Sequence, residues 1–364
     1  MAMDLQALIS SPETEVHIPA GEYIVHEPLT VPSHKHIFAD RNAHIVFVPE
    51  RPMIWSDFLL TNDNMEDGNE DIWVDGGIWD GGFGHEFNVK PNEIFENDSS
   101  SGSCLNFINV KGLKLTNLTV KNSVVYFIRL GRVRDFEIRN IVFDAEKRSW
   151  NQDGVHFSGF CHDGIVDHVT ALNGETNDDL IALNADDSVQ RLENRALMCG
   201  PIENIVIRNV YAENCYTAIR MASVNAPIRH IRIENVYTGC RVYAVNMDAA
   251  RYCRTPLFQE ASAPNGVGYI EDVTIDNFTA FFTDEAKNRD TLLCLEEHCK
   301  GFTITNFRRP KELDRMSEVP TIAAKNLTRQ KIEIDGNETL LTRKEDRLIH
   351  AGDFSTLKMD LIEG

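Results

Sequence analysis

The sequence predicts an all-β fold: a single-stranded right-handed parallel β-helix (a solenoid) of about ten rungs, with a helical cap at its N-terminus. Two observations predict it. A short motif centred on asparagine recurs along the chain, and the residues around each copy alternate between apolar and polar types. Alternation with a period of two indicates β-strands, and self-similarity at a period of roughly 20–50 residues indicates a repeat architecture.

The repeated motif has the form apolar-x-apolar-x-Asn-apolar-x-apolar. Asparagine tolerates the left-handed backbone conformation better than most residues, so each copy predicts two short strands joined by a bend. Successive motif centres are 23, 28, 41, 26, 42 and 29 residues apart, and the two long steps leave room for an extra turn or a loop. The centres are Asn117, Asn140, His168 in a variant copy, Asn209, Asn235, Asn277 and Asn306.

Rungs of this kind stack, bury a continuous apolar column and place like residues above one another. Cys215 and Cys240 are 25 residues apart and should therefore lie on adjacent rungs. A leucine-rich repeat has a similar period, but its repeated Leu-x-x-Leu-x-Leu pattern is absent. With 42% apolar residues, the 364-residue chain can fill such a core.

The segments outside the motif copies complete one predicted domain. Met3–Ser10 can form a short helix over the open end of the coil, and strands are expected within residues 15–48. The glycine-rich stretch Asp75–Gly82 predicts a rung with tight turns. The predicted division of residues 1–364 is 1–14 for the N-terminal cap, 15–307 for the β-helix rungs and 308–364 for a C-terminal cap or tail.

The charge of the chain limits its partners. It carries 36 Lys and Arg against 56 Asp and Glu, a formal charge of −20, and has no Lys/Arg-rich run. Phosphate binding needs clustered cations, so no nucleic-acid partner is expected. No apolar stretch reaches the roughly 20 residues that cross a bilayer, so no membrane partner is expected either. The oligomeric state is not predicted.

The N-terminus and the cysteines bear on location. Residues 1–4, Met-Ala-Met-Asp, are not followed by the apolar run of a signal peptide. The sequence therefore predicts a cytoplasmic location, or a secreted one if residue 1 is the start of a processed chain. The eight cysteines form no Cys-x-x-Cys pair and are expected to be buried thiols rather than a disulfide framework.

Three aspartates are the main candidates for chemistry. Asp153 lies in the string Asn151-Gln152-Asp153-Gly154, and the pair Asp178 and Asp179 follows 25 and 26 residues later. Because this spacing matches one coil, the three carboxylates should lie together on one face. Repulsion among them should raise one pKa enough to keep a proton for a leaving group. Such a set of acids is what hydrolysis of a glycosidic bond requires.

On these motifs the chain resembles the polygalacturonase family, glycoside hydrolase family 28, within the pectate-lyase-like right-handed β-helix superfamily. The resemblance covers roughly residues 15–240. The family pattern is Asn-Thr-Asp-Gly, then Gly-Asp-Asp or Gln-Asp-Asp, then Gly-His-Gly, then Arg-Ile-Lys. Asn151–Gly154 and Asp178–Asp179 match the first two, Gly-His-Gly is absent, and the last becomes Arg220–Ala222.

The resemblance implies an inverting glycosidase acting on a pectin-like or related oligo- or polysaccharide, with no cofactor and no metal. It implies that Asp178 is the general acid and that Asp153 with Asp179 activates water. Inversion needs acid and base carboxyl groups roughly 6.5–9.5 Å apart. The residues expected to bind substrate are Asn151 in the first motif, His156 just beyond it, Arg195 near the missing Gly-His-Gly, and Arg220 in the last motif.

Each of these residues also has a plainer interpretation. The acids can be polar turn residues, Arg220 an ion-pair partner on the outer face, and His156 an ordinary strand residue. Asp186 and Asp187 form a second acidic pair that could hold a cation, although a solvated loop is the simpler interpretation. Trp79 and Trp150 can stack on a sugar or fill the end of a rung.

Two other functions stay open at this point. The first is a β-helical lyase, in which the three acids hold Ca²⁺ and Arg220 abstracts a proton. The second is a non-catalytic, tailspike-like module that binds glycans. For the hydrolase, Ala222 replaces the family lysine that holds a substrate carboxylate. We therefore expect a neutral sugar, or a uronate held chiefly by Arg220, at the cleavage site, with Arg195 the first substitute for the missing cation.

Overall fold

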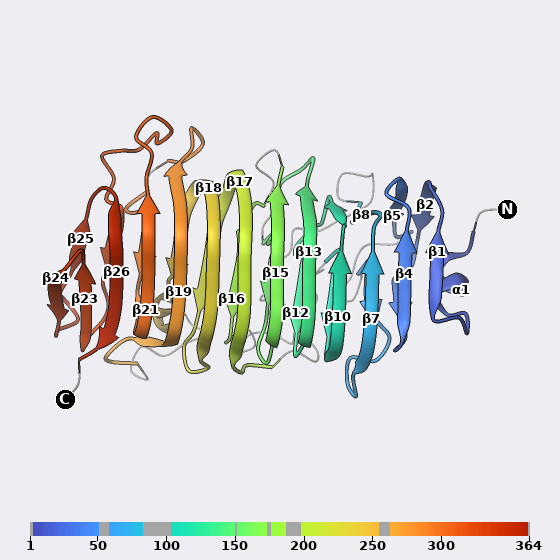
Figure 1. The fold of residues 1–364 in the computed structure, drawn as a ribbon, viewed down its shortest axis with the longest axis horizontal. Coiled ribbons are helices and arrows are strands. Elements are labelled where there is room, and N and C mark those ends of the chain that lie inside the picture. The colour runs from blue at the N-terminus through green and yellow to red at the C-terminus, as the bar shows by residue number, and fades with distance from the viewer. Residues whose placement is uncertain are drawn as a thin grey trace.

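The computed structural model shows a right-handed parallel β-helix, in which the chain winds into stacked coils. It describes residues 3–50, 58–82, 103–149, 151–172, 176–186, 198–254, 263–287 and 289–362. Three columns of short strands run along the coil. The first column extends along the long axis of the molecule, with the two termini at opposite ends (Figure 1).

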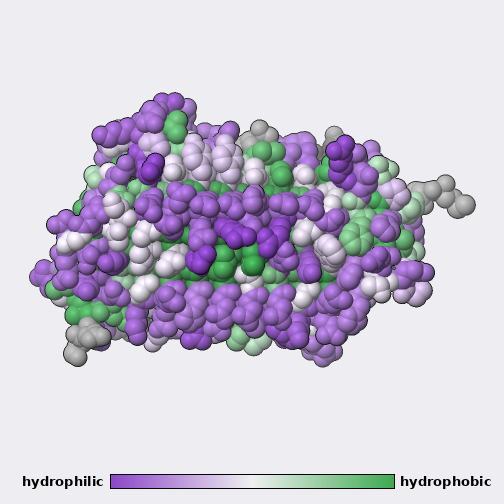
Figure 2. Space-filling view, in the orientation of Figure 1, coloured by the Kyte–Doolittle hydropathy of each residue, from purple (hydrophilic) through white to green (hydrophobic). Residues whose placement is uncertain are grey.

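The first column contains ten parallel strands in the described part of the chain, which confirms the prediction of about ten rungs. Figure 2 shows hydrophilic residues in rows along this side of the molecule, with a band between them that also contains hydrophobic and intermediate residues. The strands are β1 (Glu15–Ile18), β4 (Lys35–Ala39), β7 (Asn69–Asp75), β10 (Val110–Thr116), β13 (Arg134–Asp144), β15 (His162–Ala171), β17 (Ile202–Ala222), β18 (Ile228–Met247), β19 (Val267–Phe282) and β21 (Glu297–Arg308).

The predicted asparagine bend separates the first column from the second. Asn117, Asn140, Asn209 and Asn235 all have φ between 54° and 59°, and His168 has the same conformation in the variant copy. Their amides form a ladder: Asn140 donates to Asn117 at 2.9 Å, and Asn235 to Asn209 at 3.1 Å. The second column consists of β2 (Gly21–Val25), β5 (Ala43–Phe47), β8 (Ile78–Asp80), β11 (Thr119–Lys121) and the later halves of β13, β15, β17, β18 and β19.

The third column carries the site described below. Its strands are parallel and short because each lies between two turns of the coil. They are β3 (Leu29–Val31), β6 (Leu60–Asn62), β9 (Leu105–Ile108), β12 (Ile128–Gly131), β14 (Val155–Phe157), β16 (Asp179–Asn184), the ends of β17 and β18, β20 (Leu293–Leu295) and β22 (Ile322–Ala324).

The ends of the coil differ from its middle. Helix α1 (Leu5–Ile9) begins at Asp4, whose side chain accepts a hydrogen bond from the Ala7 N–H at 3.0 Å, and a 3₁₀ helix, η1 (Ala249–Arg254), follows β18. Among the described residues, no helix is long and apolar enough to cross a membrane. At the C-terminal end, antiparallel pairing replaces parallel stacking in β23 (Gln330–Ile334), β24 (Asn337–Leu341), β25 (Leu348–His350) and β26 (Phe354–Leu361).

The predicted division into one domain with two caps stays a prediction, although stacking continues past residue 307, because β22 pairs in parallel with β20. The coil encloses one long apolar core built from inward-facing side chains such as Ile207 and Ile233. Cys215 pairs in register with Cys240 on the next rung, as predicted, and their sulfur atoms are 3.9 Å apart. All seven cysteines whose side chains are described are free thiols.

Candidate active site

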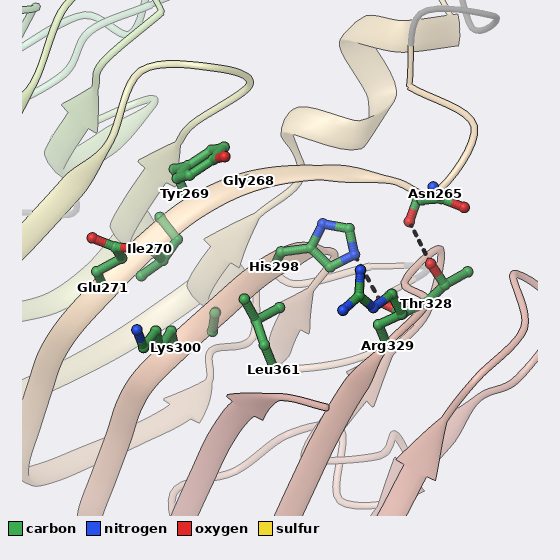
Figure 3. Close-up of a pocket in the computed structure, with 11 residues that line it drawn as sticks. Asn265, Gly268, Tyr269, Ile270, Glu271, His298, Lys300, Thr328, Arg329 and Leu361 are labelled. Carbon is green, nitrogen blue, oxygen red and sulfur yellow. Dashed lines mark hydrogen bonds between the residues drawn. The ribbon is translucent and has the colours of Figure 1, made fainter. Parts of the chain in front are cut away.

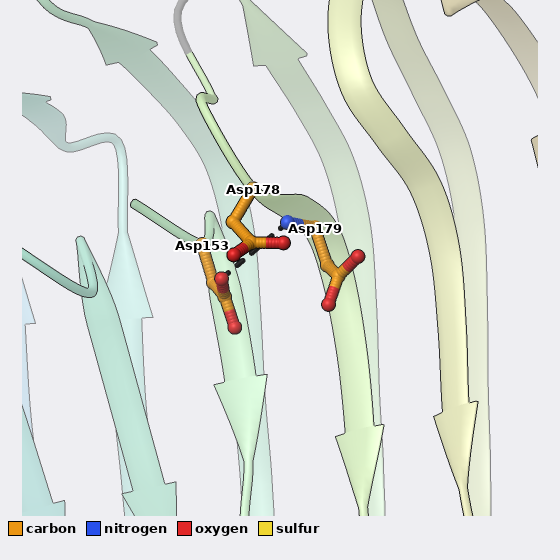
Figure 4. A group of neighbouring side chains, drawn as sticks. All are labelled: Asp153, Asp178 and Asp179. Atoms are coloured by element: carbon orange, nitrogen blue, oxygen red, sulfur yellow. Dashed lines mark hydrogen bonds between the residues drawn. The ribbon is translucent and has the colours of Figure 1, made fainter. Parts of the chain in front are cut away.

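The structure brings together the three aspartates that the repeat spacing predicted. One carboxylate oxygen from each of Asp153, Asp178 and Asp179 lies within 4.8 Å of the others. Figure 4 shows them gathered where the chain enters β14 and β16 of the third column. Asp153 and Asp179 are buried, whereas Asp178 is partly exposed. Of the three, Asp178 is therefore the carboxyl group best placed to meet a ligand.

Backbone pairing between neighbouring rungs sets this geometry. Val155 of β14 pairs in register with Ile181 of β16, and the Gly154 N–H donates to the Asp179 carbonyl at 2.9 Å. A side chain at Gly154 would place a Cβ 2.4 Å from the Leu180 carbonyl oxygen, so the glycine permits this close approach. The Asp179 N–H in turn points at Asp153 Oδ1, 3.4 Å away. The glycine after Asp153 thus lets the backbone of this rung pack closely against the next rung, which carries Asp178 and Asp179.

The three acids affect one another's protonation. Burial, followed by the charge of Asp153, raises the pKa of Asp178 to about 7. Burial and the neighbouring charge of Asp178 hold the pKa of Asp179 well above its usual value, while Arg220 opposes both shifts. These directions agree with the expectation that three close carboxyl groups cannot all ionise at little cost. The cluster therefore carries a proton at neutral pH.

His156 is the partner of Asp153. Its Nδ1 lies 2.5 Å from Asp153 Oδ2, and both side chains are almost completely buried. The imidazole packs against the Tyr126 ring with a centroid separation of 4.1 Å. In this structure His156 contacts the Asp153 carboxylate and holds it in place. Its predicted contact with a sugar stays a prediction.

Arg220 lies on the other side of the acids. It is the register partner of Ala182 on β16, and its Nε is 3.8 Å from Asp179 Oδ2. Its Nη2 is 2.7 Å from Oδ1 of Asp248, a buried carboxylate that follows β18. The predicted substrate-binding arginine is thus already bracketed by two carboxylates of the protein.

The other predicted residues have different outcomes. Arg195, Asp187 and Trp150 lie outside the described residues. Asn151 lies two residues before Asp153, at a bend with φ of 56°.

Asp186 is buried, and its Oδ2 accepts backbone N–H bonds from Val224, Asn225 and Ala226 at 2.5, 3.0 and 3.1 Å. Asp186 thus anchors the loop at residues 224–226. A cation at the Asp186–Asp187 pair stays untested, since Asp187 lies outside the described residues. Trp79 is fully buried in the core and fills a rung.

Three further residues of this region were not predicted from the sequence. They are Asp248, Asn184 and Asn246, all less than one-tenth exposed. No motif marks them. The rung period is the only signal that would have found them, since Asn184 pairs in register with Ala222 and Asn246 with Arg220.

The acids also qualify as a cation site by geometry. In the described part of the chain, Asp153, Asp178 and Asp179 form the one group of three side chains that could hold a metal ion. Carboxylate oxygens suit a hard cation such as Ca²⁺. The lyase alternative would use these same residues, with Arg220 as the base, although both described contacts of Arg220 are to carboxylates.

A separate pocket of about 240 Å³ lies along β19 and β21 (Figure 3). Tyr269, His298, Lys300 and Arg329 are among its lining residues, and none of the three clustered acids is. Burial lowers the pKa of His298, which accordingly stays neutral at physiological pH. With Glu271 as its single lining carboxylate, the pocket lacks the paired acids that glycosidic cleavage requires.

Comparison with known proteins places the fold and the motifs in context. A family model described as glycosyl hydrolases family 28 matches residues 49–326. Polygalacturonase-2 of Solanum lycopersicum is 28% identical over 123 residues, which are 34% of this chain and 26% of that protein. The match thus spans about a quarter of the relative's length.

Solved structures show a related shape. The tailspike protein of E. coli bacteriophage HK620, in complex with a pentasaccharide, aligns over 89% of this chain and 61% of its own, with a TM-score of 0.54 and 13% identity. The family 28 exopolygalacturonase of Yersinia enterocolitica aligns over 89% of this chain and 74% of its own, with a TM-score of 0.46 and 14% identity. At this identity the tailspike likeness shows the fold alone.

Proposed function

Because the chain belongs to glycosyl hydrolases family 28, we propose that it is a glycosidase that cleaves a pectin-like oligo- or polysaccharide with Asp178 as general acid. The observation that carries the proposal is the partly exposed Asp178 carboxyl, whose pKa is raised to about 7 beside two buried acids. A carboxyl group that keeps its proton at neutral pH can protonate a leaving group.

The proposed reaction adds water across one glycosidic bond. Asp178 donates its proton to the glycosidic oxygen as the bond from that oxygen to the anomeric carbon breaks. Water attacks the anomeric carbon and gives up a proton to the carboxylate base formed by Asp153 and Asp179. His156, 2.5 Å from Asp153, holds that carboxylate in position. Positioned acid and base catalysis of this kind contributes roughly 10²–10⁴-fold each.

Inversion at the anomeric carbon is the proposed stereochemical outcome, and it follows from the family rather than from the carboxylate spacing. The nearest oxygens of the three acids lie within 4.8 Å of one another, closer than the roughly 6.5–9.5 Å typical of inverting pairs. Proton NMR of the first-formed product settles this point. Inversion predicts the anomer opposite to that of the substrate, and the same anomer would assign Asp153 or Asp179 as a nucleophile.

A panel of pectin-derived and related glycans, followed by product analysis, tests the proposal itself. Hydrolysis predicts two saturated products and no new ultraviolet absorbance. A lyase would leave a double bond that absorbs in the ultraviolet and would need Ca²⁺, so a chelator would stop it. Binding without any cleavage across the panel would favour the glycan-binding module and contradict the glycosidase.

A further inference from the structure

We propose that Asp248 determines the charge of the sugar at the cleavage site, so that the site selects an uncharged unit over a uronate. This inference rests on the proposed glycosidase function. It starts from the contact between Arg220 Nη2 and Asp248 Oδ1, 2.7 Å apart, with both side chains largely buried. A guanidinium whose charge is already balanced by buried carboxylates of the protein attracts a further carboxylate less strongly than a guanidinium without such partners.

The position of Asp248 follows from the register of the third column. Arg220 pairs with Asn246, and Asp248 lies two residues beyond Asn246, just as Ala222 lies two residues beyond Arg220. Side chains two residues apart on a strand share a face. Asp248 lies just past Met247, the last residue of β18, and its contact with Arg220 shows that it turns toward the strand that carries Arg220 and the small Ala222.

A second cation reinforces Asp248 rather than opposing it. Arg251 Nε lies 3.4 Å from Asp248 Oδ2, and Arg251 also donates to the Tyr243 hydroxyl at 3.0 Å. Each oxygen of Asp248 thus faces a different guanidinium. These contacts hold Asp248 in place, and they engage both Arg220 and Arg251.

Two buried acceptors beside the Arg220–Ala222 segment have no hydrogen-bond partner. They are Oδ1 of Asn184 and Oδ1 of Asn246. The two asparagines lie on the rungs either side of the Arg220–Ala222 segment and face outward with it. An unpaired buried acceptor costs roughly 1–3 kcal/mol, so a ligand that donates hydrogen bonds is favoured here. Sugar hydroxyl groups donate such bonds, and an ionised carboxylate cannot.

The charge balance points the same way. Arg220 lies 3.8 Å from Asp179 and 2.7 Å from Asp248, so a uronate carboxylate placed at Arg220 would lie beside the Asp248 carboxylate as well as beside the guanidinium. Like charges at such distances in a partly buried site repel strongly. An uncharged ring avoids this repulsion and still meets the acceptors of Asn184 and Asn246.

The test compares two ligands with the same sugar and linkage: a galacturonate hexamer and its fully methyl-esterified form. Binding is measured by calorimetry in the Asp178→Asn background, so that turnover does not interfere. We expect the ester to bind at least about tenfold more tightly than the acid. Adding Asp248→Asn together with Ala222→Lys frees Arg220 and supplies an ammonium group, and should shift the ratio of affinities at least about tenfold toward the acid.

Asp167→Asn is the matched control, because Asp167 is likewise a carboxylate held by two arginines, Arg139 and Arg208, but on the first column. It should leave the ratio of affinities unchanged, and thermal melting checks that each variant is folded. Tighter binding of the acid by the Asp178→Asn parent, an unchanged ratio in the variant with Asp248→Asn and Ala222→Lys, or binding of neither hexamer overturns the inference. Discrimination between the ligands without turnover of any glycan by the wild-type chain would contradict the glycosidase alone.

Discussion

Asp167 and Asp178 lie 11 residues apart on the same coil, and their pKa values are shifted in opposite directions. Burial alone would raise the pKa of Asp167, but hydrogen bonds from Arg208 and Asn209 outweigh it and lower the pKa to about 2. At Asp178 burial and the charge of Asp153 act in the same direction and raise the pKa to about 7. The difference is the supply of donors on the two faces.

The outward face of the first column pairs its acids with cations. Asp167 accepts from Arg139 at 2.6 Å, from Arg208 at 2.9 Å and from Asn209 at 2.7 Å, which bridges three rungs. The outward face of the third column gathers acids and leaves buried acceptors without partners. One face stabilises the coil, and the other gives up stability to create a reactive site.

The largest expected effect comes from replacing the two acids in turn. Asp178→Asn should lower turnover by about 10²–10⁴-fold, because an amide keeps the shape but cannot deliver a proton. Asp167→Asn should leave turnover within about twofold and lower the free energy of unfolding by about 1–3 kcal/mol, since two arginines lose their partner. Rates on the best glycan and urea unfolding measure both. Near-normal turnover in Asp178→Asn would place the acid elsewhere.

A second pair of variants compares the inside of the coil with its outside. Ile207 is fully buried in the core, whereas its neighbour Val206 faces outward from β17 and is partly exposed. Ile207→Asp should cost several kcal/mol, because it buries an unpaired charge, and Val206→Asp should cost less than about 1 kcal/mol. Equal losses in chemical denaturation would show that β17 does not present alternating faces to core and solvent.

A smaller effect concerns stability against pH, where the two acids have opposite signs. The folded-state pKa of Asp178, about 7, lies above its usual 3.8, so its contribution is present below about pH 4 and is lost as pH rises toward 7. The pKa of Asp167, about 2, lies below 3.8, so its contribution is present above pH 4 and is lost as pH falls toward 2.

Melting temperatures from pH 2 to pH 8 check these signs. Asp178→Asn should make the melting temperature decline less as pH rises from 4 to 7. Asp167→Asn should make it fall less as pH drops from 4 to 2. A curve for Asp178→Asn that runs parallel to the wild type across pH 4–7 would mean that Asp178 titrates normally in the folded chain.

The fold, the family and the grouping of the three acids were predictable because each leaves a periodic trace. The asparagine at the bend recurs with the rung, and Asp153, Asp178 and Asp179 follow the same period. A further column of left-handed residues at the start of the first-column strands was missed. Its positions share a conformation but vary among Asp, Asn, Gly and His, so no single residue type marks every copy: Asp71, Gly112, Asp135, Asp163, Asn204, His230, Asp272 and Gly301.

The residues around the acids were less predictable because no repeated motif marks them. Asp248 contacts Arg220 across a rung boundary, and its place depends on the register between β17 and β18 rather than on a motif. His156 is buried against Asp153, and the ring of Tyr126, on the preceding rung, packs against it. Contacts between rungs need exact loop lengths, which the repeat period leaves undefined within a few residues.

The most direct measurement is a carbon-13 NMR titration of the aspartate carboxyl groups in the wild-type chain and in Asp178→Asn. The account predicts one carboxyl resonance that titrates near pH 7 in the wild type and is missing from the variant. The carboxyl group of Asp167 should stay ionised down to about pH 2 in both. A wild-type spectrum in which every aspartate titrates below pH 5 would contradict the assignment of Asp178 as the acid that keeps its proton.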